Sequence, residues 1–360
     1  MRIFSSFLGK AFVGASVGAM AIASASLAQA QDAQVVNFMS PNDSSCSVYP
    51  QWNGTTFGFW PKQGIKVNLL SSETTIPYVA FLQNGDADIV TLDSAQVLQA
   101  IDTGLPIKVV YEAFNFAPEG IVVTADSPIK TLADLKNTTI GMASDRDLIT
   151  TVITLDSIGE TLQSFNVTTV VVGDSGPVMA SALTNKTIDA FAGGSSDRSG
   201  IEAAGVQIRN ITPPEVSQNP GNSMAVWAPT IEEKREQIAR FLKGWAMAQH
   251  AGIVDTKLTA SACRVAIPEQ FENVENGLRM INNSVYGTQV RRTKVYGELQ
   301  PDVWALIQPP YLKQKEISKE LDPATFLDAS FIEAANDWTL MDVKSAMADW
   351  KKANGDKLIN

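Results

Sequence analysis

Short polar loops that follow predicted strands carry the side chains best suited to binding a small molecule. A strand end is held in place by its neighbours, so a loop placed there offers donors, acceptors and charges on a rigid support. Arginine suits an acidic group, aspartate an amine, and phenylalanine an apolar or planar part of a ligand. The candidate ligand-binding residues are Asn42, Asp43, Asp93, Ser94, Phe114, Phe116, Ser144, Asp145, Arg146, Ser195 and Asp197.

Helix starts in the same loops add a second way of binding. The free N–H groups that open the helix after Ser144 are expected to hold an anionic oxygen, with Arg146 and Arg198 as a charged clamp. Asp43, Asp93 and Asp197 would instead hold an amine. Ordinary surface loops remain the alternative for any single residue, but both halves of the chain place similar chemistry at equivalent points.

A catalytic set is not recognisable among these residues. Cys46 and Cys263 are the only cysteines, and the single His250 is far in sequence from every candidate nucleophile. The sequence has no Gly-x-Ser-x-Gly elbow with the supporting order of elements, no Walker loop and no Gly-x-Gly-x-x-Gly motif between a strand and a helix. Asp145 and Asp147 could act as paired acids, but that spacing near a helix start is more typical of caps. The sequence therefore predicts no catalytic residue, no metal site and no cofactor.

A repeated stretch indicates the elements that position the candidate loops. Residues 82–94 and 183–196 each begin with Leu, followed two residues later by Asn and six residues later by Asp, namely Asp88 and Asp189. Apolar residues and a small polar loop follow in both copies. Because strands alternate with helices around both stretches, we expect an α/β protein of two lobes with parallel sheets. Ligands of such sheets bind beyond the carboxyl ends of the strands.

The pattern of apolar residues and turn signals gives the expected elements. Strands are expected at 35–39, 65–69, 89–90, 107–111, 120–124, 139–142, 167–172, 188–192 and 223–227. Helices are expected at 51–63, 76–82, 95–101, 131–137, 148–158 and 177–183, then from residue 230 and around 269–282, 302–307, 326–336 and 342–352. The helices of the C-terminal third are interpreted as core or docking elements without chemistry.

The N-terminus and the overall charge bear on the compartment. Arg2 and Lys10, an apolar run over 11–27 and a small-x-small site ending at Ala30 predict a signal peptide of residues 1–30, cleaved after Ala30, and export of the mature chain. A membrane anchor is the alternative. The net charge of −10 argues against nucleic acid or anionic lipid as a partner. In an exported protein, Cys46 and Cys263 favour a disulfide over two separate thiols.

Several segments together resemble a known family. They are Gly64-Ile-Lys-Val, Leu82-Gln-Asn-Gly-Asp-Ala-Asp-Ile-Val, Gly104-Leu-Pro-Ile-Lys-Val-Val, Ile129-Lys-Thr-Leu-Ala-Asp-Leu-Lys and Thr139-Ile-Gly-Met. Their order and spacing from 35 to 211 resemble the SsuA/THI5-like (NMT1-like) periplasmic solute-binding proteins of the sulfonate, nitrate and thiamine-precursor group. The chain departs from them in a polar insert at 40–51 and a Gly/Ser-rich loop at 193–198.

The resemblance implies a periplasmic-binding-protein (type II) architecture and a binding function. The expected organisation is a first lobe from 31–124, a second from 125–222, a return to the first lobe with C-terminal helices over 223–360, and two crossover strands as a hinge. Such a monomer would capture a small organic solute, a sulfonate or taurine-like anion or zwitterion, and deliver it to an inner-membrane ABC permease. Alternatives are a nitrogen heterocycle, thiamine precursor or amine as ligand, a periplasmic sensor, or an enzyme with Asp93 or Asp145 as general base.

Overall fold

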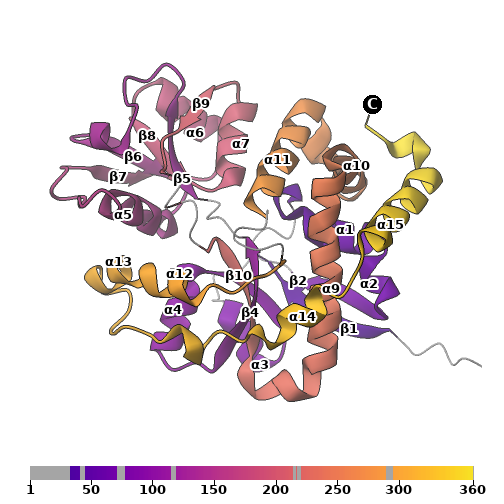
Figure 1. Cartoon of the computed structure of the whole chain (residues 1–360). Coiled ribbons are helices and arrows are strands. Elements are labelled where there is room, and N and C mark those ends of the chain that lie inside the picture. Colours follow the sequence, from indigo (N-terminus) through magenta and orange to yellow (C-terminus); the bar gives the residue numbers. More distant parts are fainter. Residues whose placement is uncertain are drawn as a thin grey trace, which may run out of the picture. The chain divides into compact units, whose positions relative to one another are not determined.

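The computed structural model describes residues 33–40, 45–70, 78–114, 119–213, 216, 220–288 and 295–359. Two five-stranded mixed sheets, each flanked by helices, make up this part of the chain (Figure 1). The predicted α/β class is thereby confirmed. The predicted signal peptide, Asn42, Asp43 and Phe116 lie outside the described residues, as do the side chains of Arg146 and Ser195.

The first sheet, sheet A, has the strand order β2-β1-β3-β10-β4. Strand β1 runs parallel to β2 and β3, whereas β10 lies antiparallel between β3 and β4. The strands cover Gln34–Met39 (β1), Ile65–Leu70 (β2), Ile89–Asp93 (β3), Ile107–Phe114 (β4) and Asn222–Trp227 (β10).

The second sheet, sheet B, repeats this arrangement with the order β7-β6-β8-β5-β9. Strand β6 is parallel to β7 and β8, and β5 is antiparallel to β8 and β9. The strands cover Gly120–Thr124 (β5), Thr139–Met142 (β6), Thr168–Val171 (β7), Ala190–Gly193 (β8) and Ile208–Asn210 (β9). The sequence boundary at residue 124 placed β5 with the first lobe. Its hydrogen bonds to β8 and β9 place it in sheet B, so the chain first passes from sheet A to sheet B between β4 and β5.

The repeated stretch makes the same contacts in both sheets. The carboxylate of Asp88 accepts a hydrogen bond from the backbone N–H of Asn37 on β1 at 2.7 Å. Asp189 accepts one from the N–H of Thr139 on β6 at 2.8 Å. Each aspartate also donates its own N–H to the neighbouring strand's carbonyl, at 2.8 Å in both cases. In each sheet the motif aspartate therefore binds the start of the neighbouring parallel strand, β1 in sheet A and β6 in sheet B.

The turn before each aspartate is also alike. Gly85 has φ 78° and Lys186 has φ 56°, and both follow the last turn of a helix. This left-handed position favours glycine, because any other residue brings its Cβ close to the backbone. The first copy has glycine at this position, Gly85, whereas the second has Lys186.

The helices before β10 cover Tyr49–Thr56 (α1), Phe59–Lys62 (α2), Tyr78–Asn84 (α3), Ser94–Asp102 (α4), Leu148–Asp156 (α5), Gly176–Thr184 (α6) and Ser195–Ala203 (α7). Those after it cover Ile231–Val254 (α9), Thr256–Ala266 (α10), Val274–Gly287 (α11), Pro301–Leu306 (α12), Gln308–Lys313 (α13), Ile332–Ala335 (α14) and Leu340–Ala353 (α15).

Three expected helices differ in form. The helix expected at 51–63 is divided into α1 and α2 at Gly58, which takes the left-handed conformation with φ 73°. The expected helix at 131–137 is a 3-10 turn, Leu132–Leu135. The one expected at 326–336 is reduced to α14 and short turns. Short helices have little stability of their own and depend on tertiary packing, so the local sequence predicts their length and type poorly.

Helix α9 anchors the C-terminal third on sheet A. Phe241 and Trp245 are fully buried with Phe38 of β1. Trp60 of α2 stacks on Phe241 with ring centroids 5.2 Å apart. Cys46 is joined by a disulfide to Cys263 of α10, and both cysteines are fully buried. The start of the described chain and its C-terminal third thus share one core.

Candidate ligand-binding site

A pocket of about 630 Å³, including the part open to solvent, lies where elements of both sheets meet. Its walls are the start of α4 after β3, helix α5 after β6, the segment leading into β10, and helices α12 and α13. The position is the expected one, since strand ends of both sheets contribute.

Asp93 and Ser94 are the predicted ligand-binding residues that line this pocket. Asp93 caps α4, because its carboxylate accepts the N–H of Gln96 at 2.8 Å while the Gln96 side chain accepts the N–H of Asp93 at 3.0 Å. Ser94 is buried and donates its hydroxyl to the carbonyl of Pro220 at 2.9 Å. The capped helix and the segment before β10 are thereby fixed to one another.

Asp147 also lines the pocket, and it binds the polar groups of Ser144. The carboxylate of Asp147, only 6% exposed, accepts the backbone N–H of Ser144 at 2.9 Å and its hydroxyl at 3.3 Å. The donors that we expected to hold a ligand's anionic oxygen therefore bind the chain's own carboxylate. Ser144 does not line the pocket and positions Asp147, which does.

Other predicted residues lie elsewhere. Phe114 is 7% exposed and belongs to the core of sheet A. Asp145 is exposed and does not line the pocket. Asp197 accepts the N–H of Gly194 at 2.8 Å, which closes the start of α7. For Asn42, Asp43, Phe116, Arg146 and Ser195 the predicted role stays a prediction, because these residues or their side chains are not described.

Glu119, Thr150 and Tyr311 line the pocket without having been predicted. Tyr311 of α13 is 3% exposed, and burial raises the pKa of its phenol well above the usual range, with the negative charges of Asp93 and Glu119 adding to the effect. The C-terminal helices were expected to be core or docking elements only. Nothing in their local sequence marks Tyr311 as a pocket residue, because the fold alone brings α13 to the strand ends.

Apolar side chains complete the pocket. Ile149 and Ile153 of α5 are separated by four residues and so share one helix face. Both pack against the core that contains Ile307 and Tyr311, and all four side chains line the pocket. Helix α5, which follows strand β6 of sheet B, therefore contacts the C-terminal helices that pack on sheet A. The pocket is therefore lined by helices associated with both sheets.

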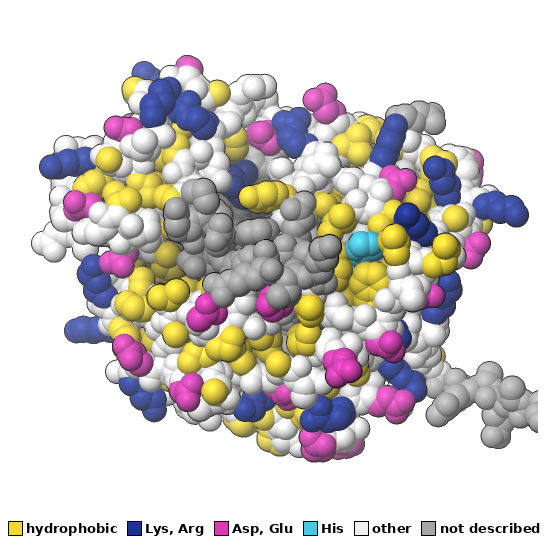
Figure 2. Space-filling view, viewed as in Figure 1, with side chains coloured by type: hydrophobic (Ala, Val, Ile, Leu, Met, Phe, Trp, Pro, Cys, Tyr) yellow, Lys and Arg dark blue, Asp and Glu magenta, His cyan; other side chains and the backbone are white. Residues whose placement is uncertain are grey.

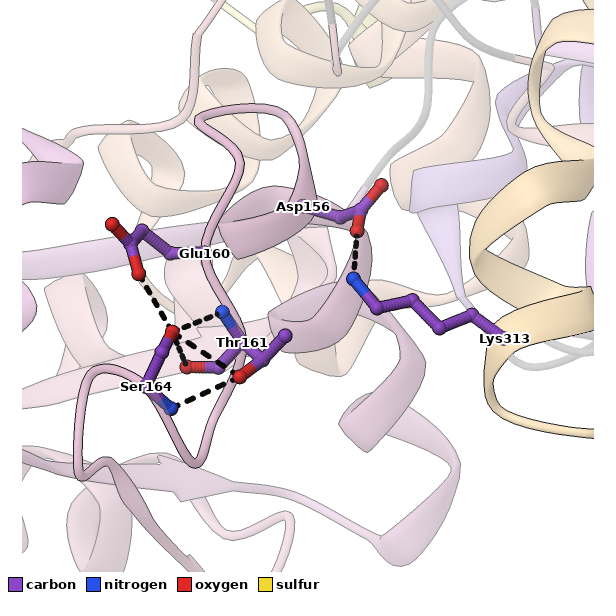
Figure 3. Close-up of polar contacts among 5 residues, drawn as sticks. All are labelled: Asp156, Glu160, Thr161, Ser164 and Lys313. Carbon is purple, nitrogen blue, oxygen red and sulfur yellow. Dashed lines mark hydrogen bonds and ion pairs between the residues drawn. The ribbon is translucent and has the colours of Figure 1, made fainter.

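Outside the pocket, two ion pairs join C-terminal helices to helices that pack with sheet B. Lys313 of α13 lies 2.8 Å from the carboxylate of Asp156 at the end of α5 (Figure 3). Arg279 of α11 lies 3.6 Å from Glu202 of α7. Elsewhere on the face in view, basic and acidic side chains are interspersed (Figure 2). Both ion pairs require the C-terminal helices α11 and α13 to lie close to α7 and α5.

Reactive groups lie away from the pocket. The ring nitrogen Nδ1 of His250 is 2.7 Å from the hydroxyl of Tyr296, and burial, followed by the charge of Lys344, lowers the pKa of His250. Both cysteines are in the disulfide. Within the described ranges, no group of three His, Cys, Asp or Glu side chains is placed to hold a metal ion. No helix of that part combines the length and apolar character needed to cross a bilayer.

Comparisons with known proteins agree with this architecture. The periplasmic aliphatic sulphonate binding protein SsuA from Escherichia coli superimposes with a TM-score of 0.63 at 15% identity, covering 81% of this chain and 91% of that one. A Candida albicans protein described as having the generic periplasmic binding protein fold gives 0.57 at 12% identity, covering 82% and 96%. The desulfurization enzyme DSZB gives 0.55 at 14% identity, covering 84% and 98%. No curated protein sequence matches the chain.

At these identities, the structural likeness concerns the fold. The family follows from the sequence itself, because the NMT1/THI5-like family profile matches residues 49–251, more than half of the chain. That range runs from α1 into α9 and includes both copies of the repeated stretch. This protein belongs to the NMT1/THI5-like family and has the fold of the periplasmic binding proteins.

Proposed function

We propose that the protein is an exported solute-binding protein that encloses a small organic molecule between two lobes and delivers it to an ABC-type permease of the inner membrane. The observation that carries the proposal is the pocket itself. Asp93 and Tyr311 come from elements around sheet A, and Asp147 and Thr150 from elements that follow strand β6 of sheet B. A ligand bound there contacts both lobes and favours the closed arrangement through those contacts.

The proposed lobes follow the two sheets. The chain passes between them twice, from β4 to β5 and from β9 to β10, so two connections would serve as the hinge. Signal-peptide cleavage after Ala30, a periplasmic location and a monomeric state are part of the same proposal. The ligand classes considered from the sequence are an organosulfonate and, as the alternative, an amine or nitrogen heterocycle.

A binding role has more support than an enzymatic one. The pocket lining contains no Cys or His among the described residues, and Asp93 already serves as a helix cap. The DSZB structure shows that enzymes occur on this fold, so turnover must be tested directly.

The test is native mass spectrometry of the protein purified from its own host, looking for a small molecule that is released unchanged. A blocking variant, Thr150→Phe, should lose the bound molecule, because Thr150 is 8% exposed and lines the pocket. Leu148→Phe is the matched control, since Leu148 is on the same helix, 37% exposed and outside the pocket lining. Chemical conversion of the molecule, or equal retention by both variants, would contradict the proposal.

A further inference from the structure

A chain of charged side chains leads from the pocket to the contact between helices α7 and α11. Glu119 is a lining residue of the pocket and lies directly before β5, where the chain first enters sheet B. Strand β5 pairs with β8 in an antiparallel register that puts Gly120 beside Gly193. The next position of this register places Glu119 beside Gly194, the residue that precedes α7. The backbone therefore brings the start of α7 next to the pocket wall.

Arg198 of α7 is held at the same place. Its Nε donates to the carbonyl of Gly194 at 3.3 Å, which keeps the guanidinium at the backbone position beside Glu119. Burial lowers the pKa of Arg198. The negative charges of Glu119, Asp197 and Glu202 act in the opposite direction, because they favour the charged guanidinium. One cation therefore interacts both with a carboxylate of the pocket wall and with carboxylates of its own helix.

Glu202 extends this chain of charges to α11. It lies four residues after Arg198, one turn further along the same face of α7. Its carboxylate is 3.6 Å from a guanidinium nitrogen of Arg279 on α11. The two side chains are 24% and 34% exposed, so solvent and salt screen this pair less than a fully exposed one. Helices α7 and α11 are in contact and lie side by side in Figure 1.

The two helices belong to different sheets. Ile201 of α7 is fully buried with Phe191 of sheet B. Ile281 of α11 is fully buried in the cluster that contains the disulfide of Cys46 and Cys263, next to α1 and α10. The contact between α7 and α11 therefore joins the part of the molecule around sheet B to the part around sheet A. Helix α11 also lies beyond the range that the family profile matches.

We propose that Arg198 is a positioning residue that couples the ligand pocket to the contact between α7 and α11. A ligand group that interacts with Glu119 changes the hold of Glu119 on Arg198. The altered position or charge balance of Arg198 then changes the interaction of Glu202 with Arg279. Because coupling between two sites is reciprocal, the contact changes ligand affinity by the same factor. The ligand side of this inference rests on the proposed binding function, whereas the coupling is a property of the chain alone.

Amide hydrogen exchange of the purified protein, without added ligand, measures the coupling. Glu119→Gln should raise the exchange rate of the peptide that contains α11 about threefold, because residues of one charge network are energetically coupled. In an Arg279→Gln background, the same change should have less than about a 1.5-fold effect, since the last link of the network is already lost. A peptide that contains β2 should keep its exchange rate throughout, which excludes a general loosening of the fold.

Two matched variants serve as controls. Glu160→Gln removes the same charge from the part around sheet B, but its carboxylate accepts the hydroxyl of Ser164 at 2.6 Å (Figure 3). It should leave the exchange of α11 unchanged. Glu275→Gln removes the other carboxylate near Arg279, which is 4.0 Å away and 88% exposed. In that background, Glu119→Gln should keep its full effect.

Arg198 itself provides the decisive comparison. Arg198→Gln should raise the exchange of α11 at least as much as Glu119→Gln does, whereas Arg198→Lys, which keeps the charge, should raise it less. The inference is overturned if either glutamine variant leaves α11 unchanged, if the effect of Glu119→Gln persists in the Arg279→Gln background, or if Glu160→Gln has the same effect. These outcomes leave the proposed binding function intact. If no small molecule co-purifies, the binding function fails and the measured coupling stands.

Discussion

Removing the motif aspartate should destabilise the two sheets unequally, although the contact is the same in both. Asp88 binds the N–H of Asn37 in a partly buried setting and also pairs with Lys234. A hydrogen bond to a charged group contributes about 1.5–3 kcal/mol, and a partly buried ion pair adds to it. Asp88→Ala should therefore cost about 3 kcal/mol. Asp189→Ala should cost about 1 kcal/mol, because that hydrogen bond is exposed and water can replace the carboxylate.

Urea unfolding followed by circular dichroism measures the cost, and hydrogen exchange locates it. In Asp88→Ala, protection should fall in the peptide that contains Asn37 and stay unchanged in the peptide that contains Thr139. Asp189→Ala should give the reverse. Lys234→Met is the control that removes the ion pair and leaves the hydrogen bond. The reasoning is refuted if Asp88→Ala unfolds at the wild-type urea concentration, or if both peptides lose protection together.

The disulfide closes a sequence separation of 217 residues, for which loop entropy predicts about 5 kcal/mol. Replacing Cys46 and Cys263 by alanine should lower the urea midpoint strongly, and an unchanged midpoint would exclude a native bond. Lys186→Gly should stabilise by about 0.5–1 kcal/mol, since φ is 56° there, and thermal melting measures it. The exposed pair of Lys313 and Asp156 is worth about 0.2–1 kcal/mol. Lys313→Met should therefore open the ligand-free protein slightly in small-angle scattering, and high salt should erase the difference.

Elements with strong local signals could be predicted from the sequence. The repeat of Asp88 and Asp189 indicated two similar halves, and the two sheets have equivalent strand orders. The assignment of β5 failed because an apolar strand of five residues carries no mark of the sheet it joins. Its partners β8 and β9 lie far along the chain, and only tertiary pairing decides between the two sheets.

The candidate site was predictable where a loop directly follows a strand. Asp93 and Ser94 were found in this way, whereas Tyr311 and Ile307 were not, because they come from helices outside the repeat. Ser144 was assigned to a ligand, but its donors bind Asp147 three residues away. The sequence shows which residues carry polar groups but not whether the partner of each group is a ligand or another part of the chain.

The position of β10 between β3 and β4 determines when each sheet can be completed during synthesis. Sheet B consists of β5 to β9, a continuous stretch from Gly120 to Asn210. Sheet A has β10 between β3 and β4, so each of these two strands lacks its partner on that side until residues 222–227 emerge. The middle of the polypeptide can thus finish its hydrogen bonding before the beginning does. Until β10 is synthesised, one edge of β3 and one edge of β4 remain without a strand partner.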